Sequence, residues 1–315
     1  MLRAMDRRQI GIGLALAAAL ISGVSVWVNA MAVKAFGDPI LYTTVKNLIA
    51  AALLIAIAAT LTTRASRHGL ARPVGVRQLV GLSFVGIVGG GVAFVLFFQG
   101  LALTSASSAG FIQKTLVIWV AILAVSFLRE RFGKAHVAAI ALLVVGQLVA
   151  SSGVAMPALS TGEALIFVAT LLWAIEVVIA KWLLAGLSPM TLAVARMGVG
   201  SIALVAFSAA TGHLAVLGSL AASQWAWVAL TGLILTAYVA TWLFALAKAQ
   251  ATDVTAMLVC GAIVTAILNS GGQPAALAPA AIGLALMAAG GIGLVLFASL
   301  PRDTRQVHRR GRISA

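Results

Sequence analysis

The 315-residue chain contains few acidic residues and almost no cysteine. It has seven aspartates and glutamates in total and a single cysteine, Cys260, so an intramolecular disulfide bond is excluded. The four histidines are scattered over the sequence and show no metal-ligand spacing. No GxxxxGK[ST] phosphate loop is present, which argues against nucleotide hydrolysis by that route. We therefore expect neither a metal nor another cofactor.

Apolar residues, by contrast, are abundant. The hydrophobic share is 62% and the charged share is 9%, which is typical of a multi-pass membrane protein without a sizeable soluble domain. The formal net charge of +14 is compatible with a nucleic-acid partner, but the basic residues lie in short loops and tails between apolar runs. Basic residues in such positions determine membrane topology. We expect the lipid bilayer, and no nucleic acid, as the surroundings of this chain.

The apolar runs predict an all-α integral membrane fold with ten transmembrane helices. The first run follows a basic start and extends to Ala32. It is about 22 residues long, which favours a membrane helix over a cleaved signal peptide. The other nine runs lie at roughly 40–61, 78–100, 106–128, 135–152, 162–184, 189–210, 225–247, 254–271 and 279–299, with boundaries good to about 2–4 residues.

The placement of positive charge supports this count. Ten helices put both ends of the chain on one side of the membrane. With a cytoplasmic N-terminus, the expected outer loops contain only Lys34 among lysines and arginines. The inner segments and the basic tail 301–315 hold most of the others, as the positive-inside pattern requires. We expect a bacterial-type inner (plasma) membrane protein with both termini in the cytoplasm.

The sequence also contains an internal repeat. Stretch 98–112 aligns with 244–258 without a gap, and the predicted halves, 1–155 and 156–300, hold five helices each. An odd number of helices makes the two halves enter the membrane from opposite sides, as in alternating-access transporters with a midplane solute site. The repeated order is tryptophan, lysine, proline and a second basic residue: Trp27, Lys34, Pro39 and Lys46, then Trp173, Lys181, Pro189 and Arg196.

These motifs resemble those of an EamA-type member of the drug/metabolite transporter superfamily. The resemblance rests on the repeated residues above, on LALTSA from Leu101, on LRERF from Leu128, and on LSP from Leu187. It covers nearly the whole chain. It implies ten helices in two inverted repeats, export of amino acids or related metabolites, and a central cavity lined by helices three, four, eight and nine.

Two lysines lie inside predicted helices. An isolated ammonium group in hydrocarbon costs about 3 kcal/mol or more, so Lys114 and Lys46 are candidate sites for a substrate carboxylate. The helical rise places both about 10–12 Å below the outer surface, where the sequence has no transmembrane carboxylate. The alternative is that each lysine extends its ammonium group toward the interface and serves only the structure.

Glu176 and Arg196 are expected at similar depths, closer to the inner surface, and we expect them to form an ion pair. A structural role is favoured, because paired charges inside a helix bundle often only neutralise one another. The alternative role is proton coupling, since Glu176 is the deepest carboxylate.

Aromatic residues within the helices are candidates for the substrate side chain. Stripes on the third and eighth helices could receive an apolar or aromatic group, although ordinary helix packing explains them at least as well. The candidates are Phe94, Phe98, Trp119, Tyr238 and Trp242.

We conclude from the sequence that the chain is a secondary membrane transporter and not an enzyme. The expected activity is export of amino acids, aromatic or other apolar ones among them, or of related small metabolites by alternating access. Efflux of drugs or nucleotide-like metabolites is the first alternative. A channel is the second, although the sequence has neither a repeated ring of charges nor a carbonyl filter. The sequence carries no signal of oligomeric state.

Overall fold

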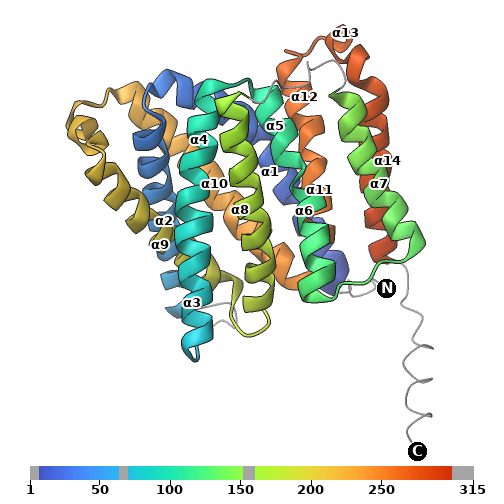
Figure 1. Cartoon of the computed structure of the whole chain (residues 1–315), viewed down its shortest axis with the longest axis horizontal. Helices are drawn as coiled ribbons and strands as arrows, with labels where there is room; N and C mark the ends of the chain where they lie inside the picture. Colours follow the sequence, from blue (N-terminus) through green and yellow to red (C-terminus); the bar gives the residue numbers. More distant parts are fainter. Residues whose placement is uncertain (1–6, 64–69, 152–159, 300–315) are drawn as a thin grey trace, which may run out of the picture.

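A computed structural model describes residues 7–63, 70–151 and 160–299, and in these ranges the chain is helical and has no strands (Figure 1). The first half comprises α1 (Arg7–Phe36), α2 (Pro39–Thr63), α3 (Val76–Phe84), the π-helix η1 (Val85–Val92), α4 (Ala93–Leu103), α5 (Ala106–Lys114), α6 (Leu116–Leu123), the π-helix η2 (Ala124–Leu128) and α7 (Lys134–Ala150). The second half comprises α8 (Thr161–Leu183), α9 (Pro189–Ala210), the 3₁₀-helix η3 (His213–Ser219), α10 (Ala222–Lys248), α11 (Ala251–Val259), α12 (Gly261–Asn269), α13 (Pro274–Leu277), the 3₁₀-helix η4 (Ala278–Ala280) and α14 (Ala281–Ser299).

The predicted fold class is confirmed. Among the described residues, nine helical spans are long and apolar enough to cross a membrane, and the shorter apolar helix α7 is the tenth. Four of the nine spans are interrupted and therefore consist of several elements. They are Val76–Leu103, Ala106–Leu128, Ala251–Asn269 and Pro274–Leu296. The predicted boundary between the halves at 155/156 and the predicted basic tail 301–315 lie outside the described residues.

Local sequence signals determine where the helices start. Asp38 accepts hydrogen bonds from the backbone N–H groups of Ile40 and Leu41, both 3.0 Å long, and so caps α2. Ser188 caps α9 in the same way, and Pro39 and Pro189 are the first residues of these two helices. The seven-residue spacing from proline to basic residue therefore places Lys46 and Arg196 about two turns into equivalent helices.

Glycines allow the helices to approach closely at three crossings. A side chain on Gly90 of η1 would overlap the backbone of α9, and one on Gly23 of α1 would overlap the backbone of α12. A side chain on Gly146 would lie 2.7 Å from a backbone oxygen of α14. Figure 1 shows α7 and α14 side by side at one end of the molecule, with α2 and α9 at the other. Small residues favour such contacts in membranes, where hydrophobic burial does not drive helices together.

The η1–α9 crossing gives a testable prediction. Gly200→Ala should lower the free energy of unfolding by about 1–3 kcal/mol, the usual range for overpacking, because the added Cβ would lie 2.5 Å from the carbonyl carbon of Gly90. Gly198→Ala on the same helix is the matched control, since nothing lies within 4 Å of its added Cβ. Thermal unfolding of both variants in nanodiscs measures the difference, and equal stabilities would contradict the close crossing.

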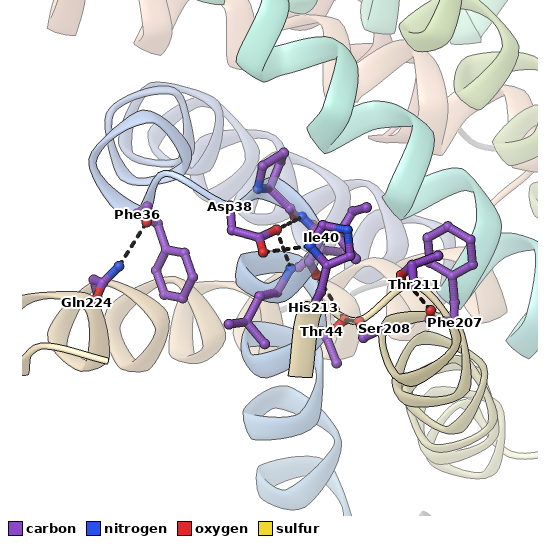
Figure 2. A network of polar contacts seen from close by, with 12 residues as sticks. Phe36, Asp38, Ile40, Thr44, Phe207, Ser208, Thr211, His213 and Gln224 are labelled. Atoms are coloured by element: carbon purple, nitrogen blue, oxygen red, sulfur yellow. Dashed lines mark hydrogen bonds and ion pairs between the residues drawn. The ribbon is translucent and has the colours of Figure 1, made fainter. Parts of the chain in front are cut away.

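A polar network joins the two halves at the end of the molecule where α1 meets α2 (Figure 2). Asp38 Oδ2 lies 2.6 Å from Nδ1 of His213, at the start of η3. The hydroxyl groups of Thr44 and Ser208 are 2.6 Å apart, and Gln224 donates a 2.8 Å hydrogen bond to the carbonyl oxygen of Phe36. We call this the Asp38 end. The opposite end, where α1 begins and α10 finishes, carries Arg7, Arg8, Lys181 and Lys248, and we call it the basic end.

Candidate functional site

A cavity of about 100 Å³ lies between the two halves of the chain. Its lining residues come from α1, α2, α4, α5, α6, α8, α9, α10 and α11. The resemblance implied a cavity lined by the third, fourth, eighth and ninth spans. All four contribute, but the first, second, sixth and seventh spans line the cavity as well.

Lys46 projects from α2 into this cavity and is buried, with 1% of its surface exposed. Its Nζ donates a 3.3 Å hydrogen bond to Oδ1 of Asn29 and lies 3.4 Å from the ring centroid of Phe98. The rings of Tyr42 and Phe94 are 5.2 and 5.4 Å away. Aromatic faces attract a cation at these distances, so three rings partly replace the hydration of the ammonium group.

Lys114 is the last residue of α5 and is also buried. Its Nζ donates a 3.2 Å hydrogen bond to the hydroxyl group of Ser22 on α1. The ammonium group also lies beside Gly261, where an added Cβ would be 3.4 Å from Nζ. Lys114 borders a second cavity of about 110 Å³ toward α7 and α14. It therefore stands between the central cavity and this side cavity.

The two spans that meet at Lys114 are both interrupted close to this residue. The fourth span is interrupted at Thr115, between α5 and α6, and the ninth at Cys260, between α11 and α12. When the repeat alignment is extended by two residues, Lys114 of the first half aligns with Cys260 of the second half. Discontinuous helices at the interface of two repeats are typical of transporter binding sites, because interrupted helices expose backbone dipoles to a solute.

Glu176 and Arg196 form a buried ion pair beside the two lysines. Arg196 Nη2 donates a 3.0 Å hydrogen bond to Glu176 Oε2, and Arg196 Nε contacts Oε1. Arg196 Nη2 also donates to the carbonyl oxygen of Gly89 at 3.3 Å, and Trp173 Nε1 donates to the same oxygen at 3.1 Å. A side chain on Gly89 would overlap the carboxylate of Glu176. The glycine run of the π-helix η1 thus makes room for the pair.

The charges that were expected at different depths reach one cavity. Lys46 and Arg196 were expected in different halves of the membrane, yet both lie over the ring of Phe94, with Nζ at 5.4 Å and Cζ at 5.2 Å from its centroid. Lys46, Lys114, Glu176 and Arg196 all line the same cavity. The estimate measured each residue from the end of its own helix. It therefore ignored the reach of long side chains, which can extend toward the centre.

Four of the five expected aromatic residues line the cavity. Phe94 and Phe98 are in contact with the cations, and Arg196 Cζ also lies 5.5 Å from the ring centroid of Trp242. The rings of Tyr238 and Trp242 are nearly parallel, with centroids 6.4 Å apart. Trp119 does not line this cavity and instead contacts Phe167 of α8, with ring centroids 5.8 Å apart. This position gives no support for a substrate-binding role of Trp119.

The sequence interpretation overlooked a buried carboxylate at the basic end. Asp253, with no exposed surface, lies 3.2 Å from Arg8 Nη2 and 2.5 Å from His136 Nε2. Nearby, Glu130 accepts hydrogen bonds from the first two N–H groups of α11, and Lys181 Nζ donates to the last carbonyl oxygens of α10. The sequence feature that could have identified this carboxylate is an aspartate at the start of an apolar run. Among the described residues, no group of three or more histidine, cysteine or acidic side chains could hold a metal ion.

Comparison with known proteins agrees with this arrangement. The sequence model described as the EamA-like transporter family matches residues 9–152 and again 160–298. A solved structure described only as "Crystal structure of protein" shares the fold, with a TM-score of 0.65 and 19% sequence identity; the match covers 90% of this chain and 97% of that one. No curated protein matches the sequence significantly.

In the described part of the chain, nine membrane-spanning helices and one shorter apolar helix surround a cavity that carries buried charges, which is the architecture of a multi-pass membrane transport protein. The chain belongs to the EamA-like transporter family, since both of its halves match the family model. It is therefore a membrane transporter of the drug/metabolite transporter superfamily, whose EamA members are transporters and not enzymes.

Proposed function

We propose that this chain is a secondary carrier that exports amino acids or related small metabolites by alternating access. The observation that carries the proposal is the pair of lysines in the central cavity. Lys46 and Lys114 have no carboxylate partner among the described residues, whereas Glu176, the carboxylate that lines the cavity, is paired with Arg196. A substrate carboxylate would complete the charge balance of the cavity, in a region where water screens charges weakly.

The remaining parts of the cavity match the rest of an amino acid. Tyr238 and Trp242 offer aromatic surface to a side chain, and aromatic or other apolar amino acids are the first candidates on that basis. The basic end faces the cytoplasm of a bacterial-type inner membrane in this proposal, with both termini on that side. The support is the distribution of arginine and lysine, which are concentrated at one end.

Counterflow into proteoliposomes tests the proposal. Vesicles preloaded with a panel of amino acids should take up the radiolabelled partner in a saturable manner, as a carrier requires. Lys114→Gln should then raise the apparent KM of the acid by about 10–100-fold, equivalent to about 1.5–3 kcal/mol for a hydrogen bond to a charged group. The same substitution should change transport of the matching amide little, because the amide has no carboxylate to lose.

Two outcomes would overturn the proposal. Flux that rises with concentration without saturating would indicate a channel. Equal losses for the acid and the amide in Lys114→Gln would show that the ammonium group does not meet the carboxylate. Lys34→Gln serves as the matched control, since Lys34 is exposed on the last turn of α1 and does not line the cavity.

A further inference from the structure

The two unpaired lysines are held by one face of α1. Lys114 is hydrogen-bonded to Ser22, and Lys46 is hydrogen-bonded to Asn29. These α1 residues are seven positions apart in the sequence. Seven residues make nearly two turns, so the two side chains lie on the same face and are separated by about 10 Å along the axis.

The wall of the cavity between the two lysines belongs to the same face of α1. Ser25 and Val26 also line the cavity, which gives lining positions i, i+3, i+4 and i+7 along the helix. Asn29 is fixed in orientation, because its Nδ2 donates to the carbonyl oxygen and the hydroxyl group of Ser25 at 2.7 and 3.0 Å. Tyr42 donates a 2.6 Å hydrogen bond to Asn29 Oδ1. The distance between the two lysine anchors is therefore set by rigid, hydrogen-bonded side chains.

Both ammonium groups retain donors for a ligand. An ammonium group has three N–H donors. The structure describes one acceptor for each lysine, Asn29 Oδ1 for Lys46 and Ser22 Oγ for Lys114. The Glu176–Arg196 pair neutralises itself, so these two lysines contribute two uncompensated positive charges to the cavity. A ligand with a single carboxylate would leave one of them unbalanced.

From this arrangement we propose that the substrate is a small dicarboxylate that spans Lys46 and Lys114, with the acidic amino acids as the preferred members. With the two ammonium groups spaced about as far apart as their anchors on α1, a charge-assisted N–H···O contact of about 2.8 Å at each end leaves roughly 5 Å between the bound oxygen atoms. This distance suits a backbone of about four to five carbon atoms. This inference rests on the proposed carrier function. It gives the substrate class as acidic and not apolar amino acids, because the charge balance of the cavity is decisive here over its aromatic surface.

A third polar group distinguishes an acidic amino acid from a plain diacid. Gln113 lines the cavity next to Lys114, and its buried Oε1 has no hydrogen-bond partner in the described part of the chain. A buried acceptor without a partner is costly and is satisfied by an added donor. With the α-carboxylate on Lys114, the α-ammonium group donates to Gln113 Oε1 and the side-chain carboxylate reaches Lys46.

The contacts of the aromatic rings support a second acid group. Phe94 and Phe98 lie against Lys46, and the centroid of Phe98 is 3.4 Å from Nζ. These two rings therefore contact a cation, whereas the sequence suggested that they receive an apolar side chain of the substrate. These rings position the ammonium group of Lys46 in the cavity. An apolar substrate side chain would leave that charge without an anionic partner.

Equilibrium binding to the full chain in nanodiscs tests this proposal, read from the fluorescence of Trp173 and Trp242, which line the cavity. Glutamate and aspartate should bind at least tenfold more tightly than glutamine and asparagine, their uncharged isosteres. In the plain acids, succinate and glutarate should bind more tightly than malonate, adipate and the monoacid butyrate. Lys46→Gln should weaken glutamate binding about 10–100-fold, to the level of glutamine, and leave glutamine binding unchanged.

Substitutions that leave Lys46 and Lys114 in place provide the controls. Lys34→Gln should leave every affinity unchanged, and Gln113→Glu should weaken binding of succinate more than binding of glutamate, because glutamate supplies an ammonium group. The comparison of glutamate with glutamine on the wild type needs no variant, so it holds even where Lys46→Gln does not fold. Equal affinities for these two ligands, or tighter binding of phenylalanine than of glutamate, would overturn the proposal.

The binding and transport assays fail in different ways. Saturable counterflow of amino acids with no advantage for a second acid group would overturn the dicarboxylate assignment and leave the carrier function standing. Tight glutamate binding without saturable counterflow would overturn the carrier function and leave the two-lysine site standing.

Discussion

Glu176→Gln should lower the free energy of unfolding by about 3–5 kcal/mol, the range found when one partner of a buried ion pair is removed. Glutamine keeps the size of the side chain but leaves the guanidinium group of Arg196 without a counter-ion in a site that is 4% exposed. Arg196 also donates a hydrogen bond to the carbonyl oxygen of Gly89, so its uncompensated charge also disturbs the η1–α9 crossing. Chemical unfolding in mixed micelles gives the free energy directly.

The double variant separates a structural role from a coupling role. Glu176→Gln combined with Arg196→Gln removes both charges and should recover part of the lost stability, because two neutral amides can hydrogen-bond to one another. A single variant that folds as well as the wild type but transports independently of pH would contradict the structural role. Glu176 would then be the proton-coupling site, with Arg196 as the charge that its protonation releases.

The fold was predictable from the sequence because its determinants are local. Hydropathy located the spans, the distribution of arginine and lysine supported their number, and the repeated prolines marked the starts of α2 and α9. The interruptions were not predictable in this way, since a π-helix or a break at Cys260 changes backbone hydrogen bonds without changing hydropathy. The partners of the glycine run 89–91, which are the ion pair and α9, were likewise not visible in the sequence.

The candidate site was predictable in its residues but not in its arrangement. A charge in an apolar run is visible in any sequence, which is why Lys46, Lys114, Glu176 and Arg196 could be selected. Their common cavity depends on how α1, α2, α5, α8 and α9 cross, and this is tertiary information. The anchors Ser22 and Asn29 were missed for the same reason. A serine or an asparagine in a membrane helix is unremarkable until its partner is known.

Asp253→Asn should open the basic end of the molecule. Asp253 is in the first turn of α11 and holds Arg8 of α1 and His136 of α7, so one buried carboxylate joins both halves of the chain. Asparagine removes the negative charge that both of these side chains contact. We expect a loss of about 3–5 kcal/mol in stability, as for other broken buried pairs, and a shift toward arrangements in which the basic end is separated.

Cysteine labelling measures that shift. Leu258 lines the central cavity about one and a half turns beyond Asp253, and Cys260 is the only cysteine in the chain, so Leu258→Cys in a Cys260→Ser background gives a single reporter. A membrane-impermeant maleimide applied from the basic end should label this reporter at least about tenfold faster in Asp253→Asn, which corresponds to about 1.4 kcal/mol of differential stabilisation. Labelling from the Asp38 end should not accelerate.

Asp38→Asn is the matched control, because it removes the other aspartate–histidine contact between the halves, at the opposite end of the molecule. The side chains of Asp38 and His213 are 23% and 30% exposed, against 0% and 8% for Asp253 and His136, so water compensates more of the loss. Its expected cost is about 0.2–1 kcal/mol, from the weakened contact with His213, because asparagine caps a helix about as well as aspartate does. Similar labelling rates from the basic end in both variants would mean that Asp253 stabilises the fold in general and does not hold that end closed.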